Sequence, residues 1–330
     1  MMRWTHARLA LPLLAFAACR CGPKPGHAVP VDASPSVSRP AVATPNGSAP
    51  AEAAPPMKGN FECPAELADA RRDGTKAHLY VEPTDHERKV LGEAIAKLAQ
   101  NEPAPALEAI GFETVRPAGW PDVVLVREKG RRRGGGAYVV RVGSKSTLLV
   151  EAPHTFFDEG TFPLACELFQ RSRARALFIN TSHRYKSAPK TADGKYPADV
   201  AHSAASLFHV ATEALVGQQK GLSVVQVHGF ATREVDARAV ASSGDKRGGA
   251  PWVAKVAKSL SEIMAGKVLR YPEDTSELGA TTNVQGMVVR RAGGKFLHVE
   301  MDDEMRRRLL ADAALRARAL DAIALAMVDE

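Results

Sequence analysis

The chain has 330 residues, 45% of them hydrophobic, and a formal net charge of +7. This content suffices for the core of one large domain or two ordinary ones. The charge is only mildly basic, and nucleic-acid binding needs a wider basic face with interleaved aromatic residues, which the sequence lacks.

Residues 1–18 are typical of a secretory signal. Arg3 and Arg8 precede a short apolar segment that is too short to span a membrane as a stable helix. The small residue Ala18 stands directly before Cys19, as in the cleavage box of bacterial lipoproteins. Either Cys19 is acylated and anchors the chain to a membrane, or ordinary cleavage leaves it as a thiol. With either alternative, we expect the mature protein to leave the cytoplasm.

Residues 19–58 are rich in Pro, Ala and Ser and show no apolar period, so we expect a disordered tether. Residues 59–330 then form one domain. The cysteines show no CxxC pair with a matching partner, which excludes a zinc ribbon. Cys63 and Cys166 either form a disulfide, as an oxidising envelope allows, or Cys166 is simply a small buried residue.

The first part of the folded chain predicts one helix and three strands. TDHERKVLGEAIAKLAQN opens with a capping box of Thr84 and Glu87 and continues at helical spacing. DVVLVRE, AYVVRV and STLLVEA follow as β-rich runs. Between the first two, the RRRGGG stretch (Arg131–Gly136) predicts a solvated hairpin turn.

From Thr161 onward, helices and strands alternate. FPLACELFQRSRA predicts a helix and ALFIN a strand, followed by a helix over Asp199–Gly217 and the strand LSVVQVHGF. A helix near Trp252–Met264, the strand GKFLHVEM and one long amphipathic helix from Asp303 complete the chain. This alternation predicts an α/β fold, a three-layer αβα sandwich with a mostly parallel or mixed central sheet.

Three predicted strands end in residues suited to metal or acid–base chemistry, namely His154, His228 and Glu300. Carboxyl ends of strands converge on one crevice in such sheets. Two histidines and an acid are the ligands of catalytic zinc, and both Asp158 and Glu159 follow His154 closely. Glu300, an acid inside an apolar strand, is costly without a role, and we expect it to shuttle a proton.

These stretches also resemble a known superfamily. APHTFFDEGT is similar to the PHGG-x-x-E-x-GT stretch of poly-γ-glutamate hydrolases and to the GHGG-x-D-x-G stretch of zinc-dependent N-acetylmuramoyl-L-alanine amidases. VVQVHGF resembles their later strand histidine. FINTSHRY resembles the Asn-Arg strand of N-formylglutamate amidohydrolases, and TTNVQGMVV followed by FLHVEMDDEMR resembles the end of such domains.

The resemblance implies a zinc-peptidase-like fold with Zn²⁺ held by His154, His228 and an acid. It favours Asp158 as that acid, although Glu159 remains open. It assigns Glu300 as catalytic acid or base, and Arg184, with Asn180, as the binder of a substrate carboxylate. Thr155 and Phe156 replace the two family glycines, so the entrance is bulkier.

We therefore expect a lipid-anchored zinc-dependent amide hydrolase in the cell envelope. Its partner would be a carboxylate-bearing peptide or amide of the peptidoglycan-stem or γ-glutamyl type. The alternative is a non-catalytic binding lipoprotein on the same fold, which would need no buried acid beside a metal.

Overall fold

The computed structural model of the chain describes residues 62–231 and 235–328. The signal, the whole tether and Cys19 lie outside these residues and stay predictions. Within the described ranges, no helix is long and apolar enough to cross a membrane.

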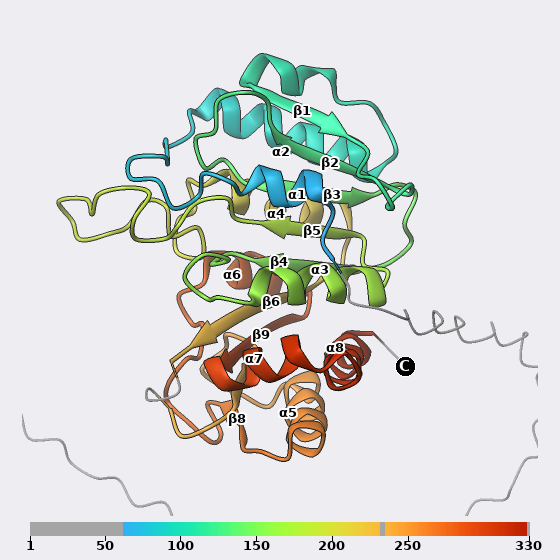
Figure 1. Cartoon of the computed structure of the whole chain (residues 1–330), viewed down its shortest axis with the longest axis vertical. Coiled ribbons are helices and arrows are strands. Elements are labelled where there is room, and N and C mark those ends of the chain that lie inside the picture. Colours follow the sequence, from blue (N-terminus) through green and yellow to red (C-terminus); the bar gives the residue numbers. More distant parts are fainter. Residues whose placement is uncertain (1–61, 232–234, 329–330) are drawn as a thin grey trace, which may run out of the picture. The chain divides into compact units, whose positions relative to one another are not determined.

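A mixed sheet of nine strands forms the centre of the described structure (Figure 1). The strands are β1 (Phe112–Val115), β2 (Val123–Glu128), β3 (Ala137–Arg141), β4 (Leu148–Ala152), β5 (Ala176–Ile179), β6 (Ser223–Phe230), β7 (Ala239–Ser242), β8 (Val268–Tyr271) and β9 (Phe296–Asp302). Their order across the sheet is β1-β2-β3-β5-β4-β6-β9-β7-β8. The neighbours β5, β4, β6 and β9 run parallel, while β3 and β7 join them antiparallel.

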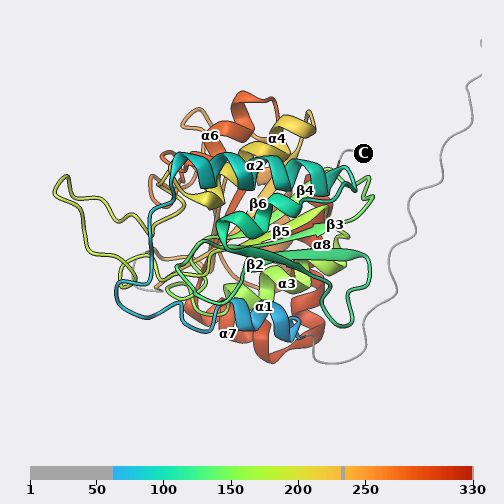
Figure 2. The same ribbon diagram turned by 90° about the horizontal axis from the view of Figure 1, so that it is seen from above.

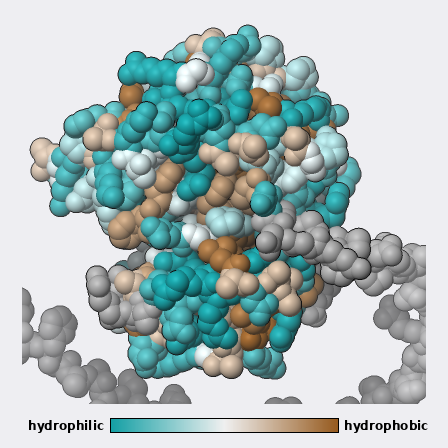
Figure 3. Space-filling view, in the orientation of Figure 1, coloured by the Kyte–Doolittle hydropathy of each residue, from teal (hydrophilic) through white to brown (hydrophobic). Residues whose placement is uncertain are grey.

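Helices cover both faces of this sheet, as Figure 2 shows edge-on. One apolar core contains residues of α1 (Ala65–Ala70), α3 (Thr161–Arg171), α5 (Pro251–Met264), α7 (Asp303–Ala311) and α8 (Ala313–Met327). The core on the opposite face contains residues of α2 (Asp85–Ala99), the 3₁₀ helix η1 (Pro105–Ile110), α4 (Leu207–Gln218) and α6 (Val284–Arg291). The predicted three-layer α/β fold is confirmed. Because these helices bury their apolar residues against the sheet, the outward face in Figure 3 is mainly hydrophilic.

Two predicted helices were wrong in extent. The helix expected over Asp199–Gly217 begins only at Leu207, because Ser206 caps it by accepting a hydrogen bond from His209 N. The long closing helix is two helices, α7 and α8. The break lies at Asp312, where the backbone is extended. The Asp312 side chain caps the start of α8 by accepting hydrogen bonds from Ala314 N and Leu315 N.

The RRRGGG stretch does connect β2 to β3 in an antiparallel hairpin, as predicted, but the expected solvation is wrong for its three glycines, which are buried. Arg131 is exposed at the turn. Arg132 pairs with Asp69 and Arg133 with Glu87, so two of the three arginines are structural ion-pair partners.

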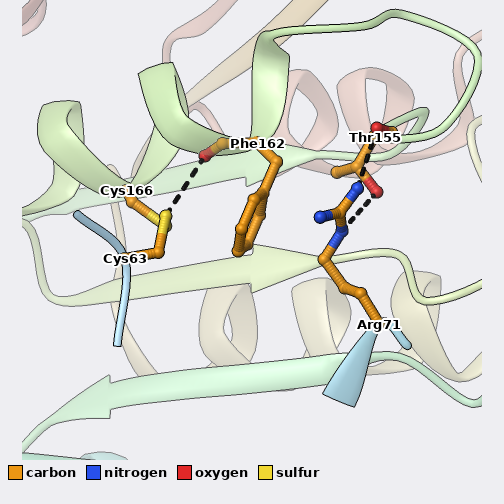
Figure 4. The surroundings of a disulfide bond; sticks show 5 residues. All are labelled: Cys63, Arg71, Thr155, Phe162 and Cys166. Carbon is orange, nitrogen blue, oxygen red and sulfur yellow. Dashed lines mark hydrogen bonds between the residues drawn. A yellow bond between two sulfur atoms is a disulfide. The ribbon is translucent and has the colours of Figure 1, made fainter. Parts of the chain in front are cut away.

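Cys63 and Cys166 form a disulfide, the first of the two alternatives left open by the sequence (Figure 4). The bond ties the segment that leads into α1 to α3. Directly after α1, Arg71 donates from Nε to Thr155 Oγ1 at 3.1 Å and from Nη2 to Thr155 O at 3.0 Å. Its guanidinium carbon also lies 4.0 Å from the ring centre of Phe162. The residue that follows His154 is thus held through both its side chain and its backbone by an arginine that is distant in sequence.

Candidate metal centre

The polar residues of the site stand on one face of three parallel strands. The apolar residues that alternate with them belong to the α3 face, so the site side chains lie on the face covered by α2, α4 and α6. Strand register brings them into two rows: Glu151 of β4, Gln226 of β6 and His298 of β9 form one, and His228 and Glu300 form the next. This alternation, visible in the sequence, determines the face of the sheet, and the positions of His228 and Glu300 near the ends of β6 and β9 place the site at the carboxyl ends of the strands. The end of β6 and the long loop between β5 and α4 lie on the left of Figure 1.

His154, Asp158 and His228 converge there. Asp158 Oδ2 lies 3.5 Å from His154 Nδ1 and 3.3 Å from His228 Nδ1, and the two imidazole rings are 4.7 Å apart. All three side chains are at most 3% exposed. Each can offer one ligand atom to a common point, which is the donor set expected of a metal centre.

The surroundings of Asp158 indicate whether a cation would be stable between this residue and the two histidines. Both of its carboxylate oxygens are buried, and neither has a hydrogen-bond partner among the described residues. Burial opposes ionisation of Asp158, but the two histidines outweigh it and lower its pKa, so the group is charged near neutral pH. A buried, ionised carboxylate with no donor is costly, and a divalent cation between it and the histidines would remove that cost.

His154 is oriented by groups that the sequence reasoning did not identify. Its Nε2–H donates to Asp199 Oδ1 at 2.8 Å, which leaves Nδ1 on the side of Asp158. Burial alone would lower the pKa of His154, but Asp158 and Asp199 together raise it. Arg184 pairs with Asp199 and approaches His154 Nδ1 to 3.2 Å through Nη1. A metal bound at Nδ1 would displace this last contact and leave the Arg184–Asp199 pair.

His228 is held by a neutral group instead of a carboxylate. Gln226 Oε1 lies 3.1 Å from His228 Nε2, while Nδ1 faces Asp158. Burial is the main cause that lowers the pKa of His228 to about 4. The imidazole is therefore neutral near pH 7, the form that binds metals.

Glu300 lies in register with His228 on the adjacent strand. Its Oε1 is 3.5 Å from His298 Nε2, and its buried Oε2 has no hydrogen-bond partner within the described part of the chain. Burial, reinforced by the Asp158 charge, raises the pKa of Glu300 to about 8. Such a carboxyl group can exchange protons near neutral pH. His228, His298 and Glu300 also form a second group with metal-ligand spacing, which shares His228 with the first.

The remaining predicted residues are placed differently. Glu159 is exposed and is not among the described residues that have metal-ligand spacing to the histidines, so of the two candidate acids Asp158 is the one at the centre. Arg184 is half-buried beside it. Asn180 lies close to the residue that precedes His154, because its amide donates to Pro153 O. The same amide donates to Ser182 O, and Asn180 Oδ1 accepts from Ser182 N. These bonds shape the loops and leave Asn180 little capacity for a substrate.

Three contributors were missed by sequence reasoning. Asp199 was treated as the first residue of a helix, although it lies in the loop before α4. Gln226 stands two residues before His228 on the same face of β6, but no role was predicted for it. Glu151 carried the same signal as Glu300, an acid inside an apolar strand, and could have been found by the same argument.

Fold and cluster together define a three-layer α/β protein with a candidate metal centre at the carboxyl ends of its parallel strands. Comparison of the sequence with protein-family models and with curated proteins gives no match. Similar solved structures include a bacteriophage poly-gamma-glutamate hydrolase (14% identity, TM-score 0.41, covering 58% of this chain and 88% of that one). They also include an N-formylglutamate amidohydrolase from Ralstonia eutropha (11% identity, TM-score 0.38, covering 58% of this chain and 97% of that one). A third is a metallo-carboxypeptidase from Burkholderia cenocepacia (13% identity, TM-score 0.34, covering 75% of this chain and 70% of that one). The first two are kinds of enzyme that the sequence motifs resemble.

Proposed function

We propose that this chain is a zinc-dependent amide hydrolase that cleaves a carboxylate-bearing peptide or amide. The observation that carries the proposal is the convergence of His154 and His228 on Asp158, whose buried oxygens have no hydrogen-bond donor in the described structure. A buried acid that titrates near neutral pH, Glu300, stands beside this cluster.

The residues divide the chemistry between them. His154, Asp158 and His228 would hold zinc, which when bound polarises a carbonyl and activates water. In its ionised form, Glu300 would take the proton that the attacking water releases, at the Oε2 that has no hydrogen-bond partner among the described residues, and deliver it to the leaving nitrogen of the amide. The metal ligand His228 and the proposed acid–base residue Glu300 already stand at paired positions of the neighbouring strands β6 and β9.

Arg184 is the proposed binder of the substrate carboxylate. Its guanidinium is half-buried next to the cluster, and its Nε has no hydrogen-bond partner among the described residues. The exposed rings of Tyr185 and Phe157 flank it, with ring centres 4.6 and 5.6 Å from its guanidinium carbon. An anionic group entering past these rings would meet a cation before it reached the metal ligands. This favours peptidoglycan stem peptides and γ-glutamyl amides as substrate classes.

The proposal includes location. Acylation at Cys19 would anchor the mature chain to a membrane of the cell envelope, where the tether would let the domain reach peptide in the wall. No nucleic acid is expected as a partner.

The test combines zinc analysis with amide hydrolysis on the full-length protein. The parent should contain near-stoichiometric zinc and release amine from a γ-glutamyl amide or a stem peptide. His228→Ala and Asp158→Asn should lose both metal and activity. Glu300→Gln should keep its zinc and lose turnover by roughly 10²–10⁴-fold, the usual contribution of general acid–base catalysis.

Glu159→Gln is the matched control, because it changes the neighbouring exposed acid and should preserve metal and activity. Retained turnover in Glu300→Gln would contradict its role. A folded parent that takes up no zinc when it is supplied would overturn the proposal in favour of a tethered binding protein.

A further inference from the structure

We propose that Gln226, held by Glu151 and by two backbone-anchored amides of the α6 region, is a positioning residue that fixes which nitrogen of His228 faces the metal. The inference rests on the metal centre of the proposed function. It concerns a hydrogen-bond network behind that centre, in which the direction of each bond determines the direction of the next.

Glu151 sets one side of the network. It is fully buried, and its Oε2 accepts from Gln226 Nε2 at 2.7 Å. Whether Glu151 is ionised or carries its proton on Oε1 beside Thr212, its Oε2 can only accept, so the amide nitrogen of Gln226 must be the atom that faces it. The two residues are register partners on β4 and β6, which keeps them at this spacing.

Asn283 and Gln285 set the same direction independently. Asn283 Oδ1 accepts from the backbone Gly286 N at 2.8 Å, so its Nδ2 is the atom that donates to Gln226 Oε1 at 2.7 Å. Gln285 Nε2 donates to the backbone Val200 O at 2.9 Å, so its Oε1 is the atom 3.4 Å from Gln226 Nε2. A backbone N–H can only donate and a backbone carbonyl can only accept, hence neither amide can be reversed without losing a buried bond.

The orientation of the Gln226 amide determines which nitrogen of His228 carries the hydrogen. With its nitrogen committed to Glu151 and Gln285, Gln226 presents its carbonyl oxygen to His228 Nε2 at 3.1 Å. A carbonyl cannot donate, so Nε2 must carry the hydrogen and Nδ1 keeps its lone pair toward Asp158. Asp158 alone would favour the opposite tautomer, with the hydrogen on Nδ1, because it lies 3.3 Å from that nitrogen. The network opposes this and keeps Nδ1 ready for a metal.

The experiment reads the tautomer directly in metal-free protein. Long-range ¹H–¹⁵N NMR of full-length protein labelled at histidine distinguishes Nε2–H from Nδ1–H, and competition with a chromophoric chelator gives zinc affinity. We expect Nε2–H at His228 in the parent. Gln226→Leu, which removes the acceptor, should move the hydrogen to Nδ1 and weaken zinc binding by roughly 10–100-fold, the usual effect of losing such a partner.

Two substitutions of Glu151, which does not contact His228, complete the design. Glu151→Gln should keep the parent tautomer and affinity, because a glutamine can accept from Gln226 and donate to Thr212 Oγ1, which itself contacts Phe208 O at 3.1 Å. Glu151→Leu removes the acceptor for Gln226 and should give a mixture of tautomers with intermediate affinity. This variant decides the matter if Gln226→Leu does not fold.

Nδ1–H in the parent would overturn the inference, as would an unchanged tautomer and zinc affinity in both leucine variants. Failure of the proposed function gives a different result. A parent that shows Nε2–H and binds zinc, yet hydrolyses no amide, would remove the hydrolase and leave the positioning network in place.

Discussion

Glu151 is a carboxyl group in the middle of the sheet, and among the described residues its oxygens are bonded to the uncharged side chains of Thr212 and Gln226. Burial raises its pKa to about 7, against an ordinary value of 4.5. Between these values the folded chain holds a proton that the unfolded chain has released. Stability must therefore fall as pH rises through this window, by about 3 kcal/mol in total at 1.36 kcal/mol per pH unit.

The matched variant Glu151→Gln should remove this dependence. Its free energy of unfolding relative to the parent is expected to increase by up to about 3 kcal/mol between pH 4.5 and pH 8. Urea unfolding of metal-free protein at the two pH values measures the difference. An equal pH profile in parent and variant would show that Glu151 titrates at its ordinary pKa.

Individual site residues could be predicted from the sequence where the chemistry of the residue conflicts with the residues around it. Glu300 was predicted because an acid interrupts an apolar strand, and His154 and His228 because they end such strands. Asp199 gave no comparable signal, since an aspartate before a helical pattern is ordinarily a cap. Its place beside His154 depends on the loop before α4, and no local pattern specifies the path of that loop.

Elements were predicted where one periodicity persisted and were misjudged where a cap interrupted it. The apolar spacing continues from α7 into α8, yet Arg316 of α8 turns back to donate to the carbonyl of Leu309 at 2.9 Å and to Leu310 O at 3.1 Å. Its guanidinium also pairs with Glu167 of α3 at 2.5 Å. The break is therefore a tertiary feature, and a pattern of apolar residues cannot reveal it.

Asp312→Ala distinguishes one helix from two. In a continuous helix this exposed substitution would stabilise the chain, because alanine has the highest helix propensity. In the structure Asp312 Oδ1 accepts from Ala314 N and Leu315 N, both at 2.9 Å, so its loss should lower the free energy of unfolding by about 1 kcal/mol. Urea denaturation measures it, with Asp312→Ser, which keeps a capping oxygen, expected to stay within a few tenths of a kcal/mol. Stabilisation by alanine would contradict the cap.

For the whole molecule, the fold class followed from the alternation of strands and helices, but the order of strands did not. The parallel group β5-β4-β6-β9 places β9 beside β6 although β7, β8 and two helices, α5 and α6, separate them in sequence. Such pairing is decided by long-range packing on both faces of the sheet. It is also what brings Glu300 next to His228, so the site could be proposed from the sequence but not assembled from it.

Because the proposed ligands come from the end of β4, the loop after it and β6, metal binding should stabilise the folded chain as a whole. Free zinc at one hundred times its dissociation constant adds about 2.7 kcal/mol to the free energy of unfolding. For a domain of this size we expect the melting temperature to rise by roughly 5–10 °C, and added chelator should reverse the rise.

The variants then locate the ion between the two groups that share His228. With zinc held by His154, Asp158 and His228, Asp158→Asn should lose the rise in melting temperature, while Glu300→Gln and Glu159→Gln should keep it. If the ion instead occupied His228, His298 and Glu300, Glu300→Gln would lose the rise and Asp158→Asn would retain most of it. We expect the first result for two reasons. Asp158 is ionised, and its two buried oxygens lack a hydrogen-bond donor in the described structure. The pKa of Glu300, in contrast, is raised to about 8, so its carboxyl group favours the neutral form at pH 7.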